Sequence, residues 1–378
     1  MYKKMFDIFY DAICDEISVE NDLLKRLDKS NFRFTPLRGL KTISLIEKYK
    51  INLFVYSVIC VIFILVSPVY FLIKLFKKIA IKQDNKDEIA EENLILVANG
   101  RVDYLYNKLN KSEKVTYINI NQNNKINYIS YEKYLKLSDY FLAYIFSLIS
   151  IFYLLYKLKN KTDILQAYVA FEWFLVYLSL NRLKKGAKKV FFANHYDRWA
   201  VMFDQLFENK EVSLLQHGIL PDILQLDYKL ENINTIYYYD NKSKILFEQI
   251  FNLKNVQYEK LPLSLKLSAI KSDKTTILVI GQPHSRDMEV VIIKSLISQY
   301  EIYIKPHPLY SDKKYKNIKG LHIIDDRSFY PKVDLALCYE STLGLEYEAS
   351  GVNVLWWKDY DIKSIYDIIK NKLKDTNA

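Results

Sequence analysis

Cysteine is scarce in this chain, and several other common features are missing. The three cysteines, Cys14, Cys60 and Cys338, have no metal-type spacing and leave one unpaired in any disulfide scheme, which favours a reducing cytoplasm. The N-terminus carries no signal peptide, because acids enter "MYKKMFDIFYDAICDE" before an apolar core develops, so secretion is not expected. There is no repeat of solenoid period and no recognised RNA or DNA motif. The dispersed basic residues further disfavour nucleic-acid binding.

The composition is that of a globular protein with room for two ordinary domains. Of 378 residues, 50% are hydrophobic and 26% are charged. Lys and Arg number 54 against 44 Asp and Glu, which gives a net charge of +10. Such a charge suits anionic partners, namely nucleotide phosphates, nucleic acid or an acidic membrane face. The sign of the charge does not choose among them.

Two apolar stretches raise the question of membrane contact. Residues 51–73, "INLFVYSVICVIFILVSPVYFLI", carry no charge and reach the roughly 20 residues that a helix needs to cross a bilayer. Their lysine flanks give no orientation, and Pro68 is also consistent with a re-entrant or interfacial element, while a buried core helix is the alternative. Residues 140–156 are shorter, and we expect a buried or membrane-facing helix there.

Short β-rich runs alternate with helical spacing from residue 91 onward, as in parallel α/β sheets. The pattern predicts a helical N-terminal region, 1–90, with the membrane-associated helix 51–73. A Rossmann-like domain over 91–265 and a second over 266–378 are expected to face each other across a cleft. The expected strands are 94–100, 114–120, 189–194, 212–218, 235–240, 275–281, 301–305, 321–325, 334–338 and 352–357.

Polar residues gather where these strands end, which is where ligands bind in open parallel sheets. Four of the five histidines follow apolar β-runs directly. The candidates of the first domain are Asn194, His195, Asp197, Arg198, Gln216, His217 and Gly218, and those of the second are Gln282, His284, Lys305, His307, Glu340, Ser341 and Thr342.

Two segments of the second domain favour anion binding. Pro306 and Pro308 stiffen the loop around His307, which suits a preorganised contact to a phosphate oxygen, although capping of a turn is the alternative. Ser341 and Thr342 can begin a helix whose N-terminal N–H groups attract an anion. Glu348, further along that helix, lies at about the distance of a ribose, or is a solvated surface carboxylate.

The motifs "QHG", "KPHP" and "ESTLGLEYEASG", in that order, resemble those of GT-B glycosyltransferases of bacterial surface polysaccharides. The most similar groups are CDP-glycerol glycerophosphotransferases and the sialyltransferases and Kdo transferases of capsule and lipooligosaccharide. The resemblance covers roughly residues 94–357. The "HG" lacks the following Thr-Pro of the glycerophosphotransferases, and the acidic base motif of several sialyltransferases is absent. The donor sugar therefore stays open.

The resemblance implies an inverting, metal-independent transfer from a nucleotide-activated donor, CMP- or CDP-linked, to a glycan or lipid-linked acceptor. His217 would be the general base, since an ordinary imidazole accepts protons near neutral pH. The donor phosphate would be held by Lys305, His307, Ser341 and Thr342, and the nucleotide or ribose by Glu340, Glu348, Gln282 and His284. No cofactor is expected, because the nucleotide sugar is a substrate. The enzyme would act at the cytoplasmic face of the bacterial inner membrane, as a peripheral or single-helix anchored protein.

Acceptor contacts are predicted for the remaining strand-end residues of the first domain. Gly218 would leave room for substrate beside the backbone, and Gln216 lies next to it. Asn194, His195, Asp197 and Arg198 would bind a glycan or acidic acceptor. An equally weighted alternative is that Asp197 caps the helix and Arg198 pairs with it. An epimerase-like GT-B enzyme and a non-catalytic polysaccharide-assembly module remain alternative functions.

Overall fold

The structure is a computed structural model of the 378-residue chain, and it divides into two compact units. Unit 1 comprises Met1–His217 and Pro221–Leu261, and unit 2 comprises Pro262–Ala378 together with Gly218–Leu220. Most of the predicted membrane helix 51–73 lies outside the described residues. The structure describes residues 2–26, 58, 71–76, 79, 92–98, 100–109, 111–120, 128–159, 167, 169–220, 226–251, 253–282, 285–307 and 313–375.

Unit 1 is built on a seven-stranded sheet in which every neighbouring pair of strands is parallel. The strand order is β3-β2-β1-β4-β5-β6-β7, so the direction of winding reverses between β1 and β4. Strand β1 is fully buried from Leu94 to Val97, as expected for a parallel strand covered on both faces. The strands are β1 (Glu92–Val97), β2 (Val115–Asn119), β3 (Ile129–Ser130), β4 (Ala187–Phe192), β5 (Glu211–Leu215), β6 (Thr235–Tyr238) and β7 (Gln257–Lys260).

The helices of unit 1 share an aromatic core. Phe6 and Phe9 of α1 contact Phe174 of α6, with ring centroids 5.5 and 5.0 Å apart, and Phe6 also contacts Phe146 of α5. Such edge-on and tilted ring pairs add to the apolar area that the helices bury. The helical elements are α1 (Tyr2–Arg26), α4 (Val102–Lys108), η1 (Tyr131–Tyr134), α5 (Leu137–Lys157), α6 (Ala170–Leu183), α7 (Arg198–Leu206) and α8 (Asn241–Ile250).

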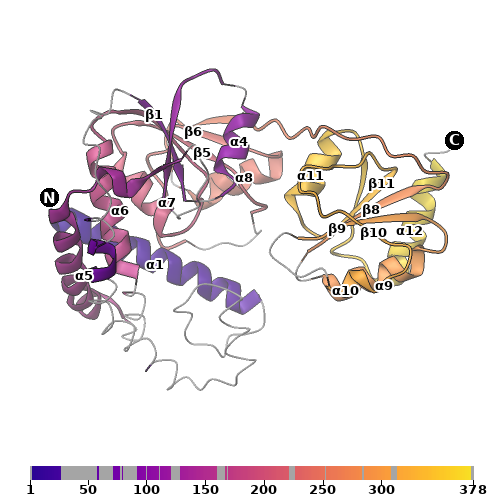
Figure 1. Cartoon of the computed structure of the whole chain (residues 1–378), viewed down its shortest axis with the longest axis horizontal. Helices are drawn as coiled ribbons and strands as arrows, with labels where there is room; N and C mark the ends of the chain where they lie inside the picture. The colour runs from indigo at the N-terminus through magenta and orange to yellow at the C-terminus, as the bar shows by residue number, and fades with distance from the viewer. Residues whose placement is uncertain are drawn as a thin grey trace. The chain divides into compact units, whose positions relative to one another are not determined.

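Unit 2 repeats the same plan with five parallel strands (Figure 1). The order is β10-β9-β8-β11-β12, so winding reverses between β8 and β11. The strands are β8 (Thr276–Ile280), β9 (Glu301–Lys305), β10 (His322–Ile323), β11 (Leu335–Cys338) and β12 (Asn353–Trp356). The helices are α9 (Arg286–Leu296), α10 (Lys313–Lys316), α11 (Thr342–Ala349) and α12 (Ile362–Asp375).

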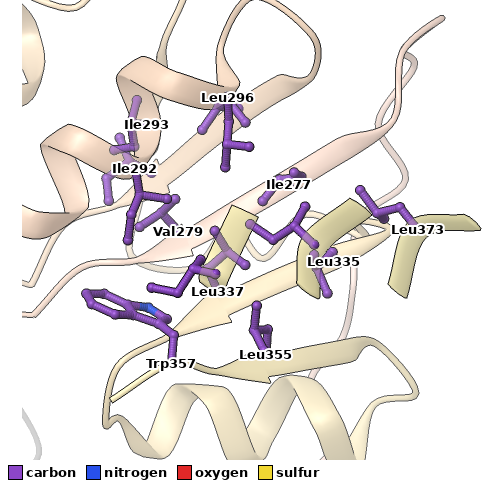
Figure 2. Packing of buried hydrophobic residues seen from close by; sticks show 14 of the residues in the cluster. Ile277, Val279, Ile292, Ile293, Leu296, Leu335, Leu337, Leu355, Trp357 and Leu373 are labelled. Carbon is purple, nitrogen blue, oxygen red and sulfur yellow. The ribbon is translucent and has the colours of Figure 1, made fainter. Parts of the chain in front are cut away.

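Alternate residues of the unit 2 strands face two separate cores. Ile277 and Val279 of β8 pack with residues of α9 and α12 on one face of the sheet, as Figure 2 shows. Leu278 and Ile280 pack on the other face with Tyr347 of α11. Because side chains of a strand alternate between faces, a one-residue shift in register would exchange the two cores.

The ten strands expected from the sequence are all present, and the α/β class with two parallel sheets is confirmed. The stretch 140–156 forms most of α5, as expected for a helix. Two short strands, β3 and β7, were not predicted. Strand β7 reads Gln-Tyr-Glu-Lys and is largely exposed at one edge of its sheet, so it has no apolar pattern to detect.

Candidate functional site

The reversal between β1 and β4 brings three loops of unit 1 to one edge of its sheet. Strands β1, β4 and β5 are consecutive neighbours and parallel, so the residues that follow them emerge together. These residues include Arg101 after β1, His195 after β4 and His217 after β5. In doubly wound sheets this is the position where ligands bind. Arg101 was not among the residues predicted from the sequence.

His195 is a buried residue that orders the loop after β5. Its Nε2 lies 3.1 Å from the backbone N–H of His217 and 3.3 Å from the carbonyl oxygen of Leu215. This nitrogen can accept a hydrogen bond from the first or donate one to the second, depending on its tautomer. Burial and the nearby His217 hold the pKa of His195 well below its usual range. His195 is therefore neutral and fixes the position of His217.

His217 lies against His195, with ring centroids 4.3 Å apart and the ring planes tilted by 32°. Burial and the positive charge of Arg101 lower the pKa of His217 to about 4, although the carbonyl of Ala193 opposes the shift. The imidazole is consequently uncharged at neutral pH and has a lone pair with which to accept a proton. Its basicity in this state is weaker than that of an ordinary histidine.

The polar residues after β4 are occupied by structural contacts. Asp197 caps α7, accepting hydrogen bonds from the N–H groups of Trp199 and Ala200 at 2.8 and 2.9 Å. Asn194 donates to the same carboxylate at 2.6 Å. The capping interpretation of Asp197 is thus confirmed, and an acceptor role for it or Asn194 stays a prediction.

Arg198 pairs with Glu16 of α1, and its expected pairing with Asp197 stays a prediction. Both side chains are almost completely buried. Because Glu16 is 182 residues away in the sequence, nothing local to "ANHYDRWA" indicated this partner. An acceptor contact by Arg198 stays a prediction.

Gln216 connects β5 to the start of α8. Its side-chain carbonyl accepts from the N–H of Tyr239 at 2.8 Å, and its amide donates to Ser243 at 2.9 Å. Gly218, two residues later, has open space beside it, since a Cβ added there would meet no other atom within 4 Å. Open space at Gly218 is compatible with the predicted approach of substrate to the backbone, which stays a prediction.

In unit 2 the reversal between β8 and β11 lies beside Gly281. Its N–H donates to the carbonyl of Lys305 at 3.0 Å. A Cβ at Gly281 would lie 3.1 Å from both that carbonyl oxygen and the Cα of Pro306. A side chain at this position would force the ends of β8 and β9 slightly apart. The contact fixes the backbone that carries His307.

The helix α11 begins on the other side of β8, at the end of β11. Ser341 caps it through a hydrogen bond from the N–H of Leu343 at 3.3 Å, as the sequence predicted. Gly344 allows the helix to lie close to the sheet, because a Cβ there would be 2.6 Å from Trp356 and 2.7 Å from Cys338. Gly351, with φ of +81°, ends the helix in a Schellman motif.

His307 and the start of α11 therefore lie at the same edge of the sheet, with β8 between them. Strands β9 and β11 each pair with β8, which places them about 10 Å apart. This spacing allows an anion above β8 to be approached from both sides. Convergence of His307, Ser341 and Thr342 on one anion stays a prediction.

Lys305 is already engaged by protein groups. Its Nζ donates to the carbonyls of Asp326 and Phe329 at 2.8 and 2.9 Å and lies 4.7 Å from the centre of the Tyr330 ring. Burial lowers the pKa of Lys305. These contacts tie the end of β9 to the loop at 326–330. A phosphate contact by Lys305 stays a prediction.

The residues predicted to contact the nucleotide differ in burial and in their partners. Glu340 forms an exposed ion pair with Lys358 at 2.8 Å, and Glu348 is exposed on α11. Gln282 is partly buried and donates its backbone N–H to Glu289 at 2.8 Å. His284 lies outside the described residues. A ribose or base contact by these side chains stays a prediction.

Glu289 is a buried residue that the sequence analysis missed. Its carboxylate accepts from the backbone of Gln282, from Ser285 at 2.6 Å and from the hydroxyl of Tyr315 at 2.5 Å. Burial raises the pKa of Glu289, although these hydrogen bonds oppose the shift. The residue anchors the loop after β8. The spacing Ser285 to Glu289, one helical turn, was the available signal.

No group of three or more metal-ligating side chains is placed to hold an ion within the described ranges. Metal independence stays a prediction. Across the same part of the chain, α5 is the one helix long and apolar enough to cross a membrane.

Comparisons with known proteins find little similarity. No family model matches the chain, and no curated protein matches it either. Among solved structures, the crystal structure of TarM is similar with a TM-score of 0.37 and 13% sequence identity, over 54% of this chain and 51% of that one. This chain thus spans about half the length of TarM. A likeness of this size identifies neither a shared fold nor a shared activity.

Proposed function

We propose that this chain is a glycosyltransferase of the GT-B type, which moves a sugar or polyol phosphate from a CMP- or CDP-linked donor to a glycan or lipid-linked acceptor. One observation carries the proposal. Each unit has a parallel sheet with a winding reversal, and the motif residues His217 in one unit and His307 and Ser341 in the other follow strands beside it. This is the placement that nucleotide and substrate sites have in such sheets.

Unit 2 binds the donor. The N-terminal N–H groups of α11 and the imidazole of His307 contact the phosphate, and the partial positive charge of the helix end favours that anion. The contact between Gly281 and the end of β9 supports this role, since it fixes the approach to the edge of the sheet. Glu340, Glu348 and Gln282 contact the nucleoside.

Unit 1 binds the acceptor, and His217 is the general base. Its ring is uncharged at pH 7 and can take a proton, although the lowered pKa makes it a weaker base than an ordinary histidine. The acceptor hydroxyl loses its proton to His217 as its oxygen attacks the donor. In a sugar donor the attack is on the anomeric carbon, the bond from that carbon to the phosphate oxygen breaks, and the nucleotide leaves with the electron pair, which inverts the anomeric centre. In a CDP-linked polyol the attack is on the distal phosphorus, and CMP leaves with the electron pair of the broken P–O bond. No metal takes part, since the α11 N-terminus and His307 stabilise the leaving phosphate.

The test compares matched histidines. His307→Ala should weaken nucleotide binding at least tenfold, measured by calorimetry with CMP, CDP, UDP and GDP. His322→Ala is the control, because His322 lies on the neighbouring strand β10 with a largely exposed side chain. His217→Asn should abolish transfer and leave nucleotide affinity unchanged. Equal binding by both unit 2 variants, or transfer by His217→Asn, would exclude the proposal.

The acceptor places the enzyme at the cytoplasmic side of the inner membrane. A lipid-linked acceptor is confined to the bilayer surface, so an enzyme that remains at that surface meets it more often. The net charge of +10 and the apolar stretches 51–73 and 140–156 support this location.

A further inference from the structure

The helix α5 turns large apolar side chains outward, unlike a surface helix of a soluble protein. Such helices normally turn their apolar stripe to the core and their polar residues to solvent. The buried residues of α5 are mixed, since Asp139, Ser147 and Ser150 lie among Tyr140, Ala143, Phe146 and Leu154. Large apolar side chains point outward at intervals of three or four residues along its whole length. They are Leu137, Phe141, Ile145, Leu148, Ile149, Phe152, Leu155 and Tyr156.

A neighbouring helical segment also turns apolar side chains outward. Phe71 lies against α5, with its ring centroid 5.4 Å from Phe141 and 4.9 Å from Tyr144. Lys74 turns inward and pairs with Glu132 at 2.8 Å. The outward residues are Leu72, Ile73, Phe76 and Ile79. Together with the eight outward residues of α5 they form a surface that we call the apolar face.

The apolar face holds most of the exposed large apolar side chains in the described part of the chain. It accounts for twelve of the seventeen such residues, eight from α5 and four from residues 71–79. Scattered single residues of this kind are normal on a soluble protein, whereas a contiguous patch marks an interaction surface.

The exposed charged residues at the two ends of α5 are lysines, whereas Glu132 is partly buried against Lys74. Lys133 and Lys136 precede α5 and Lys157 and Lys159 end it, and all four are exposed. The single acid of α5, Asp139, is buried and receives a hydrogen bond from Arg182 at 2.6 Å. Basic residues at both ends of an apolar stripe complement a bilayer surface with anionic headgroups.

We propose that the apolar face is a membrane-docking surface that lies in the plane of an anionic bilayer. The orientation follows from the opposite side of α5, which packs on α6 and carries the ion pair of Asp139 with Arg182. A helix with one side covered by protein and a buried ion pair cannot be surrounded by lipid. It therefore rests in the interface and does not cross the bilayer.

A second copy of the chain fits this face less well than lipid does. In a symmetric pair the same face meets itself, so each residue contacts a copy of the stripe. The lysines at the two ends of α5 would then approach other lysines, and the outward face of α5 has no exposed acid to pair with them. The charge distribution therefore favours lipid.

Binding to vesicles tests the proposal with the full chain. Wild-type protein should float with vesicles of phosphatidylcholine containing phosphatidylglycerol, and bind pure phosphatidylcholine more weakly. Ile145→Glu and Phe152→Glu, at residues 49% and 72% exposed, should each reduce the partition coefficient about tenfold or more. Lys136→Gln and Lys159→Gln should each reduce it about fivefold on the anionic vesicles alone.

The control is Ile245→Glu, which makes the same change at an equally exposed isoleucine of α8, 52% exposed. It should bind vesicles like wild type and match Ile145→Glu in thermal unfolding. Equal vesicle binding by the two variants, or no binding by wild type, would overturn the proposal. So would a wild-type dimer that Ile145→Glu converts to a monomer, measured by light scattering without lipid.

The in-plane orientation has its own readout. Lys136→Cys and Lys159→Cys place a thiol just beyond either end of the stripe, at exposed positions outside the apolar face. Protein bound to the outside of sealed vesicles is treated with a membrane-impermeant maleimide, and the labelled peptides are identified by mass spectrometry. An in-plane helix leaves both ends on the outer side, so both react. Protection of one end alone would show that α5 crosses the bilayer.

Discussion

The carboxyl edges of the two sheets use polar residues in different ways. In unit 1 most of the side chains after β4 and β5 hold the protein together, as Gln216 does between β5 and α8 and Asp197 does at the start of α7. In unit 2 the corresponding edge is shaped largely by backbone contacts at Gly281 and by the capped start of α11. A polar residue after a strand therefore has no function by position alone. Its partners decide whether it stays available to a ligand.

Removal of the buried ion pair between Arg198 and Glu16 is expected to have the largest effect on the free energy of unfolding. Arg198→Ala leaves Glu16 buried without its cation, which should lower the free energy of unfolding by about 3–5 kcal/mol. Chemical denaturation of both proteins at neutral pH provides the measurement. A variant as stable as wild type would mean that this residue is not part of the scaffold and is free for the acceptor.

Asp15 of α1 is a second buried charged residue of unit 1, and it should make the stability of the protein depend on pH. Burial, together with the carboxylates of Asp197, Asp227 and Glu16, raises the pKa of Asp15 from 3.8 to about 7. Since the folded-state pKa is above the unfolded-state value, the carboxyl's contribution to stability is complete below about pH 3.8 and is lost as pH rises to about 7.

Asp15→Asn removes this loss and keeps an acceptor for the N–H of Tyr228, which lies 3.2 Å from Oδ1. At pH 8 the variant should be more stable than wild type by on the order of 2–4 kcal/mol, with the difference vanishing near pH 4. Urea denaturation at both pH values measures it. A difference that did not change with pH would contradict the assigned titration.

Alanine substitutions at Gly281 and Gly218 compare a crowded glycine with an open one. Gly281→Ala places a methyl group against the backbone of Lys305 and Pro306, which should cost about 1–3 kcal/mol and weaken nucleotide binding. Gly218→Ala is the matched control, because nothing lies within 4 Å of its Cβ, and it should change stability by less than about 0.5 kcal/mol. Thermal unfolding with and without nucleotide distinguishes them. Equal losses in both variants would remove the special role of Gly281.

The smallest expected effect concerns the charge beside His217. Arg101→Gln should move the pKa of His217 upward from about 4, because the cation that disfavours the imidazolium is gone while burial remains. Titration of the imidazole carbon resonances by NMR reads this value without an activity assay. A pKa near 6.5 in wild type, or no change in the variant, would show that Arg101 and burial do not control this ring.

The local features of this fold were predictable, and the long-range ones were not. Short β-rich runs gave the ten strands, and local chemistry gave the Ser341 cap. The neighbourhood of Arg101 and His217 depends on the pairing of β1 with β4, which are far apart in the sequence and carry no signal for one another. The partners of Arg198 and Gln282 were not predicted either. Arg198 pairs with Glu16, 182 residues away, and Gln282 donates its backbone N–H to the buried carboxylate of Glu289.

Nucleotide binding by the two unit 2 histidine variants tests the central claim most directly. Calorimetry with CMP and CDP should show at least tenfold weaker binding for His307→Ala and an unchanged affinity for His322→Ala. If both variants bind a nucleotide as wild type does, the edge of the unit 2 sheet is not the donor site and the assignment of glycosyl transfer is wrong.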